Sequence, residues 1–478
     1  MSPRLPVNTG ARGPASRIAA ALALLALGAC ASFSADGGFA VVEQVAAERL
    51  GKEARWTKSA AERGAVDRKV AELLAAPLRI DDAVQVALLN NRGLQAAYAE
   101  LGVAEADVVQ AGRLPNPGFS FGRLRRGDET ELERGLHLNL ARLLAMPMVR
   151  DVSSRRFERV KHDAALETLK LAADTRKAWI AAVAAGESAR YLRQVLEAAD
   201  ASAELARRMA RAGNWNRLQQ AREQGFYADA ALGVARAERL EAATRERLTR
   251  LMGLWGAQAG FRLPDRLPGL PDEAAAMPDV ERRAIAQRLD VQAARLGVEQ
   301  TARNLGLTKA TRFVDVLELG LVRNSSNEAP TQRGWEVRFE LPLFDWSGAR
   351  VARAEAIYMQ ALDRAAAIAI DARSEVREAY GAYRSAYDVA RHHRDEIVPI
   401  RKRIAEENLL RYNGMLIGVF ELLADARAQV AAVNAYLDAL RDYWIARADL
   451  ELALIGKPGL AMPAMAGSAP PAAAGPAH

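Results

Sequence analysis

The chain has 478 residues, of which 50% are hydrophobic but only 6% are aromatic, and its formal net charge is +7. Because much of the apolar content is alanine, this composition suits long helices packed through small side chains better than one thick core. Acidic and basic residues are interspersed, and no basic stripe carries interleaved aromatic residues, so the sequence gives little support for nucleic-acid binding.

An export signal is predicted at the start of the chain. Residues 18–27 form an apolar run that is too short to span a membrane, and three arginines precede it. The sequence Leu-Gly-Ala-Cys that ends at Cys30 resembles a bacterial lipobox, so we expect residues 1–29 to be removed and Cys30 to be the lipid attachment site, carrying acyl chains such as palmitate. The alternative is an ordinary signal peptide with an incidental cysteine. The residue after the cysteine, Ala31, favours sorting to the outer membrane.

The first half of the chain alternates between helical and strand patterns. Residues 30–78 are predicted to be an N-terminal wrapping segment, with a short helical pattern at 41–50. The elements expected after it are a helix over 80–110, a β-hairpin formed by runs at 118–122 and 136–140, and helices over 151–212 and 217–251.

The same order is expected again after a proline-rich linker at 257–279. The second set comprises a helix over 280–307, strands over 313–322 and ending at 341, one long helix over 349–411 and a return helix ending at 454. Gly213 and Gly414, which interrupt the long helices, lie 201 positions apart, which indicates an internal duplication. We therefore divide the chain into a first repeat at 79–256, a second repeat at 280–456 and a disordered Ala/Pro tail at 457–478.

The length of the second long helix argues against an ordinary compact domain. At ~1.5 Å per residue it would reach on the order of 90 Å. Heptad-like spacing of apolar residues on the return helix (Val430, Val433, Leu437, Leu440, Trp444) predicts that these long helices pair as coiled coils.

The four predicted strands have one apolar and one charged face. The charged residues Glu336, Arg338 and Glu340 alternate with apolar ones in the last strand. Strands of about ten residues match the length needed to cross an outer membrane. Unpaired backbone groups at an open sheet edge are costly in hydrocarbon, so the strands of one chain must pair with strands from other copies. Two copies would give a filled barrel, whereas three copies would leave a wet lumen lined by these charged residues. Lipid-facing or interfacial aromatic residues would be Phe119, Phe121, Trp335, Phe339 and Trp346. The alternative is a small soluble β-layer with an amphipathic face.

The sequence offers no support for catalysis. It contains no phosphate-binding loop, no metalloprotease motif and no serine-hydrolase motif. Its only adjacent histidines, His392 and His393, lie in a charged helical stretch and would not share a helix face. We expect a protein that is not an enzyme and has no metal site and no cofactor.

Several of these motifs together resemble the TolC-like outer-membrane factor family. They are Arg-Leu-Pro-Asn-Pro at 113–117, Leu-Pro-Leu-Phe-Asp-Trp at 341–346, and Tyr-Asn-Gly at 412–414 followed by Glu-Leu-Leu at 421–423. The resemblance implies a mainly α fold with a transmembrane β element: a homotrimer in which four strands per chain form a twelve-stranded barrel that continues into a periplasmic helical tunnel. The lipobox resembles that of the subgroup serving resistance-nodulation-division pumps.

The resemblance also implies partners and a gate. Docking of a periplasmic adaptor protein and an inner-membrane pump is expected at the tunnel tip, at Gly213, Asn214, Asn413 and Gly414. In the family, aspartates close the tip, but here Phe420 and Leu423 occupy those places, which leaves Glu421 and Asp425 as the nearest gate candidates. The alternative for these two acids is a solvated helix surface. A further departure is that residues 140–148 lack the Pro-Leu-Phe-Asp form.

These features predict the outer-membrane channel of a tripartite efflux system, located in the bacterial outer membrane and anchored by lipid. Such a channel would export drugs or metal ions, but the sequence does not identify the substrate, since in this architecture the pump and adaptor choose it. The alternative function is a lipid-anchored periplasmic coiled-coil scaffold without a pore.

Overall fold

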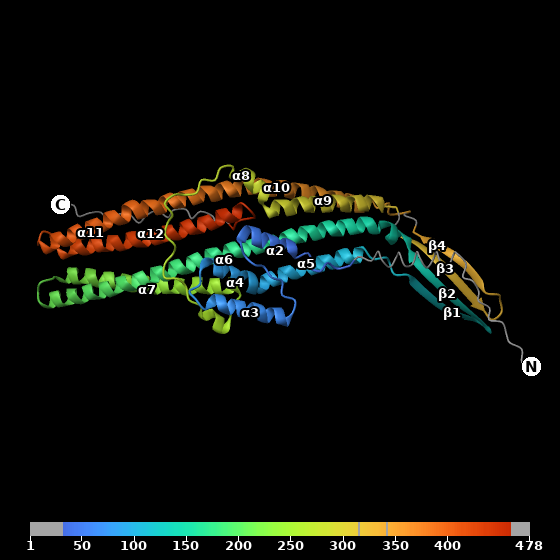
Figure 1. Cartoon of the computed structure of the whole chain (residues 1–478), viewed down its shortest axis with the longest axis horizontal. Helices are drawn as coiled ribbons and strands as arrows, with labels where there is room; N and C mark the ends of the chain where they lie inside the picture. The colour runs from blue at the N-terminus through green and yellow to red at the C-terminus, as the bar shows by residue number, and fades with distance from the viewer. Residues whose placement is uncertain (1–31, 314–315, 341–342, 460–478) are drawn as a thin grey trace, which may run out of the picture. The chain divides into compact units, whose positions relative to one another are not determined.

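A computed structural model describes residues 32–313, 316–340 and 343–459 of the chain (Figure 1). The predicted signal peptide, Cys30 and nearly all of the predicted tail lie outside these residues. Within them, no helix is both long enough and apolar enough to cross a membrane.

The first half of the chain contains a helical N-terminal segment, a long-helix pair and one β-hairpin. Its elements are α2 (Ala40–Val45), the π-helix η1 (Ala46–Leu50), α3 (Ala60–Leu74), α4 (Ile80–Asn90), α5 (Arg92–Ala111), β1 (Gly118–Arg126), β2 (Glu129–Asn139), α6 (Leu140–Arg211) and α7 (Arg217–Met252).

The second half repeats the order of the elements from α4 onward. Its elements are the 3-10 helix η2 (Gly256–Gly260), α8 (Val280–Gln287), α9 (Leu289–Ala310), β3 (Leu317–Ser326), β4 (Gln332–Phe339), α10 (Gly348–His392), the π-helix η3 (His393–Ile397), α11 (Val398–Asn413) and α12 (Val419–Ala453). The predicted alternation of helices and hairpins is therefore confirmed.

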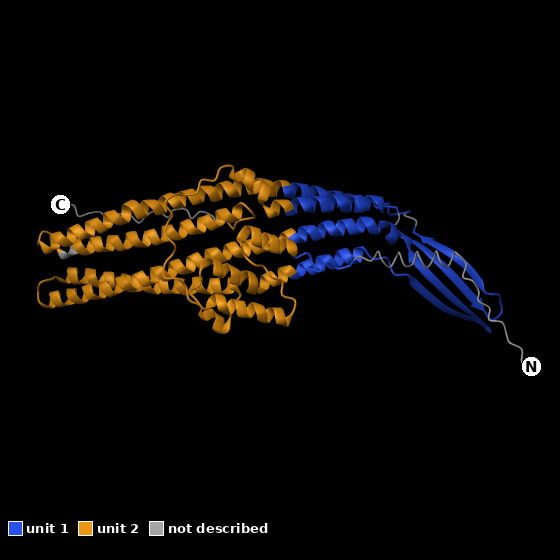
Figure 2. Ribbon diagram, viewed as in Figure 1, with its two compact units in different colours: residues 1–39, 99–161, 293–365 blue, residues 40–98, 162–292, 366–478 orange. Residues whose placement is uncertain are grey.

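The chain folds into two compact units, and each unit draws on both halves of the sequence (Figure 2). Unit 1 takes its described residues from the ranges 1–39, 99–161 and 293–365, and it contains the four strands. Unit 2 takes them from 40–98, 162–292 and 366–478. The compact units therefore do not coincide with the two sequence repeats.

Unit 1 contains one antiparallel sheet with the strand order β1-β2-β3-β4 (Figure 1). Each half contributes a hairpin, and the two hairpins join through the pairing of β2 with β3, which places Leu136 opposite Leu321. The pairing register runs without interruption along all three strand pairs. Because side chains alternate along a strand, this register settles which residues share a face.

Unit 2 holds a core of small and aromatic side chains. Tyr383 and Tyr387 on α10 pack against Tyr443 on α12, with ring centroids 5.7 and 5.8 Å apart. The linker between the halves lies against this core, because the backbone N–H of Ala275 donates to the Tyr383 hydroxyl at 2.9 Å. Linker residue Phe261 is also buried.

The helix predicted over 80–110 is instead two helices, α4 and α5, which are separated at Asn91. The amide of Asn90 is buried and donates to the backbone carbonyls of Met252 and Gly253, at 3.1 and 2.8 Å. Asn91 adopts an extended backbone and donates to the carbonyl of Leu251 at 2.8 Å. The break thus supplies donors to the otherwise unbonded carbonyls at the end of α7.

The helix predicted over 280–307 is broken in the same way, at Arg288. The Arg288 guanidinium is fully buried, donates to Asp290 and Glu375, each at 2.7 Å, and reaches the carbonyl of Ala453 at the end of α12. The backbone N–H of Leu289 donates to Ile455 at 3.0 Å. Both predictions of an unbroken helix were therefore wrong for the same reason. The residues at each break bind the C-terminal end of another helix, α7 in the first half and α12 in the second.

Two further boundaries differ from the prediction. Helix α6 begins at Leu140 rather than near 151, because the Asn139 side chain accepts from the backbone N–H of Arg142 at 2.7 Å and so caps the helix, which then accommodates Pro147. The long second helix contains a π-helical segment at 393–397, just before Pro399. Proline cannot donate a backbone hydrogen bond, and a wider turn is one way to accommodate that loss.

Candidate functional site

The polar face of the sheet carries a chain of side-chain contacts across all four strands. Ser120 on β1 hydrogen-bonds His137 on β2 at 2.8 Å, and the other ring nitrogen of His137 lies 3.1 Å from Glu336 on β4. Arg338 on β4 contacts Glu318 on β3 at 3.3 Å and Glu336 at 3.8 Å. This face is therefore hydrophilic and internally paired, as a surface in contact with water requires.

Glycines make room for this network. A Cβ at Gly320 would lie 2.6 Å from a Glu336 carbon and 2.9 Å from the His137 ring, and a Cβ at Gly135 would lie 2.5 Å from the Ser120 hydroxyl. Any side chain at these two positions would displace the His137 imidazole. The glycines thus allow His137 to lie flat across the neighbouring strands.

Of the three predicted lumen residues, the structure brings two together. Glu336 and Arg338 share the polar face, whereas Glu340 lies just beyond β4 and is exposed, with its backbone N–H donating to Val316. His137 and Glu318 were not among the lumen residues predicted from the sequence. The polar residue between two leucines in Leu136-His137-Leu138 is the signal that could have identified the first of them.

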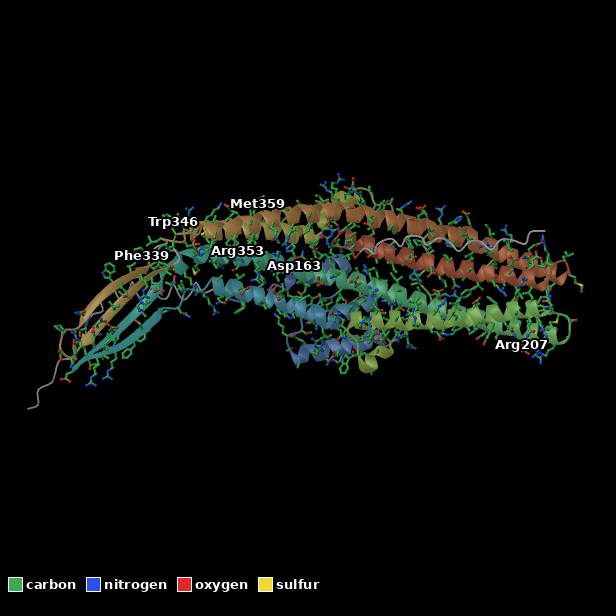
Figure 3. All side chains as sticks on the ribbon, turned by 180° about the vertical axis from the view of Figure 1, so that it is seen from behind. Asp163, Arg207, Phe339, Trp346, Arg353 and Met359 are labelled. Carbon is green, nitrogen blue, oxygen red and sulfur yellow. The ribbon has the colours of Figure 1, made fainter. Side chains whose placement is uncertain are left out.

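The opposite face of the sheet is apolar and exposed. Trp335 is 72% exposed, and Phe339 at the end of β4 is exposed as well (Figure 3). The register places large apolar residues of all four strands on this one face: Phe119, Phe121, Leu136, Leu138, Leu317, Leu319, Leu321, Trp335, Val337 and Phe339. In the segment between β4 and α10, Phe344 and Trp346 are also exposed. A contiguous exposed apolar surface of this kind is typical of a face that a membrane or another protein covers.

The two helical turns in unit 2 have the same backbone design. In the first, Gly213 has a positive φ of 78° and its N–H donates to Ala210, while Asn214 donates to Met209. In the second, the corresponding bonds run from Met415 to Tyr412 and from Leu416 to Arg411. Both are the double hydrogen bond that ends a helix with a left-handed residue.

The predicted equivalence of Gly213 with Gly414 is therefore wrong by one residue. The counterpart of Gly213 is Met415, which has a positive φ of 58°, while Gly414 has an ordinary negative φ of −81°. Asn413 is the last residue of α11. The side chain of Met415 is 93% exposed, and that of Leu416 is also exposed, so the second turn presents apolar groups to solvent.

The two candidate gate residues have different environments. Glu421, in the first turn of α12, is exposed. Asp425 is half-buried and accepts a hydrogen bond from the Asn408 amide on α11. Asp425 therefore stabilises the pairing of α11 with α12.

A buried ion pair that was not predicted from the sequence also involves α7 and α12. Glu223 on α7 is 1% exposed, accepts from the Ser202 hydroxyl on α6 at 2.8 Å, and accepts from Arg427 on α12 at 2.9 Å. The Arg427 guanidinium lies 4.3 Å from the ring centre of Phe226. This contact joins helices from the two sequence halves, and its members are 204 positions apart, so no local pattern could have revealed it.

The described residues contain no group of three or more His, Cys, Asp or Glu side chains placed to hold a metal ion. Ion pairs on the sheet join His137, Glu318, Glu336 and Arg338 on its polar face.

We compared the chain with known protein families, sequences and structures. No protein-family model matches the chain, and no curated protein sequence does. Solved structures do match. The Campylobacter jejuni CmeC outer membrane channel is 17% identical, with 86% of this chain and 91% of that chain covered at a TM-score of 0.68. The Neisseria gonorrhoeae MtrE outer membrane channel, in its open state, is 19% identical, with 79% and 89% covered at a TM-score of 0.66. A membrane protein from Pseudomonas aeruginosa is 20% identical, with 78% and 92% covered at a TM-score of 0.69.

The fold predicted from the sequence, that of the TolC-like outer-membrane channels, is therefore confirmed.

Proposed function

We propose that this protein is an outer-membrane efflux channel, in which copies of the chain assemble into one barrel. The observation that carries the proposal is the four-stranded sheet with an exposed apolar face and an internally paired polar face. Among the described residues, β1 and β4 are the edge strands. Unpaired edges in hydrocarbon cost several kcal/mol per group, so in a bilayer each β1 must pair with the β4 of a neighbour.

Three copies satisfy both faces of the sheet. Twelve strands leave room for water, which the charged residues Glu318, Glu336 and Arg338 need, whereas eight strands would bury them in a filled barrel. The proposed assembly is thus a homotrimer with the apolar face toward lipid. The CmeC and MtrE structures are described as outer membrane channels, which supports the proposal that this chain forms a channel.

Bilayer conductance of the full-length protein tests the channel. Purified in detergent, the protein should migrate as a trimer that dissociates on heating, and it should conduct ions in a planar bilayer. The competing proposal is a lipid-anchored scaffold without a pore. A water-soluble monomer without conductance would exclude the channel and support the scaffold.

We further propose that an adaptor protein and an inner-membrane pump engage the helical turns. The exposed apolar side chains of Met415 and Leu416 support docking of a partner there. The double variant M415E/L416E should abolish export in cells while leaving bilayer conductance unchanged. Loss of conductance in this variant, or full export, would contradict the assignment.

A deletion strain screened for sensitivity to drugs and metal ions would then define the exported class.

The lipid anchor at Cys30 is proposed on sequence grounds alone. Cys30→Ser should abolish incorporation of a labelled fatty acid. Persistent labelling of this variant would refute the lipobox.

A further inference from the structure

The charged side chains of the sheet are segregated between its two faces. All five acidic residues of the strands alternate onto the polar face: Glu129, Glu131, Glu133, Glu318 and Glu336. Five of the seven strand arginines instead alternate onto the apolar face: Arg123, Arg125, Arg134, Arg323 and Arg333. The apolar face therefore carries positive charge and no negative charge.

Three of these arginines form a row across adjacent strands. Arg134 on β2 is paired directly with Arg323 on β3, and Arg323 is paired directly with Arg333 on β4. Directly opposite residues have Cβ atoms roughly 5 Å apart, and like charges at such positions destabilise a sheet. Within the described part of the chain, none of the three forms an ion pair with a carboxylate. An external anion would relieve the repulsion.

The row lies where the apolar surface ends. On the side toward the helices, the next row across the sheet is Phe119, Leu136, Leu321 and Trp335, and further apolar rows follow it. On the side toward the hairpin turns, the same face carries Arg123, Arg125, Thr130 and Ser325, with Leu132 as its one large apolar residue among the strand positions. Arginine at the edge of an apolar surface places its aliphatic stem on that surface and its guanidinium at the level of the lipid head groups.

We infer that the row Arg134, Arg323 and Arg333 is a binding site for the phosphate groups of a lipid in the outer leaflet. A planar guanidinium donates two parallel hydrogen bonds to phosphate oxygens, and three of them side by side match a head group that carries more than one phosphate. The inference rests on the proposed channel function, because that function places this face in the bilayer. Around a trimer, the row would repeat at each copy and form a ring of sites.

The test uses the full-length protein in a mild detergent, titrated with a bisphosphorylated glycolipid and with the same lipid after dephosphorylation, with retention measured by native mass spectrometry. The wild type should retain the phosphorylated lipid only. R323Q/R333Q should weaken retention at least about tenfold, since each surface cation contributes about 1 kcal/mol to binding anionic lipid. R323K/R333K keeps the charges but loses the paired guanidinium donors, so its retention should lie between that of the wild type and that of R323Q/R333Q, which would show that the loss in R323Q/R333Q is not due to misfolding.

The matched control is R126Q/R338Q, which removes two arginines from the polar face of the same sheet. It should bind the phosphorylated lipid like the wild type. Equal loss in the control and in R323Q/R333Q, or equal retention of both lipids by the wild type, would overturn the inference. So would complete displacement by millimolar inorganic phosphate, because that would identify a free-anion site.

Conductance separates this inference from the proposed function. A wild type that conducts but shows no preference for the phosphorylated lipid would overturn the lipid site and leave the channel intact. A protein that neither conducts nor enters a bilayer would overturn both.

Discussion

The buried contact between Glu223 and Arg427 allows an asymmetric prediction. Glu223 is almost completely buried, whereas the side chain of Arg427 is 36% exposed. Replacing Arg427 by Met leaves a buried carboxylate whose remaining partner is the Ser202 hydroxyl. Breaking a buried ion pair in this way costs about 3–5 kcal/mol. We expect the lower end of that range, since partial exposure of the pair lets water approach.

The converse change should cost less. Glu223→Gln keeps the side-chain size and an acceptor for Ser202, and it leaves Arg427 with access to water and with the Phe226 ring. About 1–2 kcal/mol is expected. In the double variant E223Q/R427M no buried charge remains unpaired, so its cost should fall below that of R427M alone. The two substitutions should therefore be strongly non-additive.

Hydrogen exchange is the appropriate assay, because local opening of α7 and α12 need not follow global unfolding. Peptides covering residues 217–228 and 422–430 should exchange fastest in R427M and at an intermediate rate in the double variant. An exchange rate in E223Q/R427M that equals or exceeds that of R427M would refute the reasoning. The surface variant R441M, whose ion pairs are with exposed acids of its own helix, serves as the control and should exchange like the wild type.

Three further predictions test the turns, the aromatic core and the helix break. Gly213→Ala should destabilise its turn and Met415→Gly should stabilise the equivalent one, each by about 1 kcal/mol, as measured by exchange of the turn amides; equal rates would contradict the left-handed backbone. Burial against neighbouring tyrosines raises the pKa of Tyr443 to about 12. Because the folded state then holds a proton that the unfolded state loses from about pH 10, stability should fall as the pH rises from about 10 to about 12. Tyr443→Phe should flatten that part of the denaturation curve, and an unchanged slope would exclude Tyr443 as the cause. Asn90→Leu should leave two helix-end carbonyls unbonded and cost about 2 kcal/mol in thermal unfolding, and a stability equal to the wild type would show that water replaces the amide.

The predictions from sequence succeeded where the signal was local. Alternation of apolar and charged residues assigned Trp335 and Glu336 to opposite faces, and the register confirms it. Both hairpins were predicted in the right part of the chain, but their strands were misplaced: β2 begins at Glu129 rather than 136, and β3 covers Leu317–Ser326 rather than 313–322. The heptad-like spacing on the return helix likewise predicted a helix that packs through residues such as Leu440, which is buried.

The failures share a physical origin in contacts between distant parts of the chain. The Asn-Asn-Arg-Gly run at 90–93 carries a local signal that was not used, since Asn91 caps α5 by accepting from the backbone N–H of Leu94 at 2.9 Å. At both breaks, side chains also bind the end of another helix, and that long-range contact cannot be read from periodicity. The equivalence of Gly213 and Gly414 failed because a glycine was assumed to supply the left-handed residue, whereas the backbone gives that conformation to Met415. The roles of Glu223 and Arg427 depend on packing between halves, which periodicity does not encode.

The two breaks also explain how one fold tolerates dissimilar sequences. At each, the same backbone groups at the end of a return helix need donors. The first half meets this need with the neutral amide of Asn90, and the second meets it with the guanidinium of Arg288, which in turn requires the carboxylates of Asp290 and Glu375. Replacing Asn90 by Arg alone would bury an unpaired charge. Converting the amide arrangement of the first half into the guanidinium arrangement of the second therefore takes several coordinated substitutions. Backbone geometry is thus retained while residue identity drifts, which is consistent with TM-scores of 0.66 to 0.69 at 17 to 20% identity to the three solved structures described above.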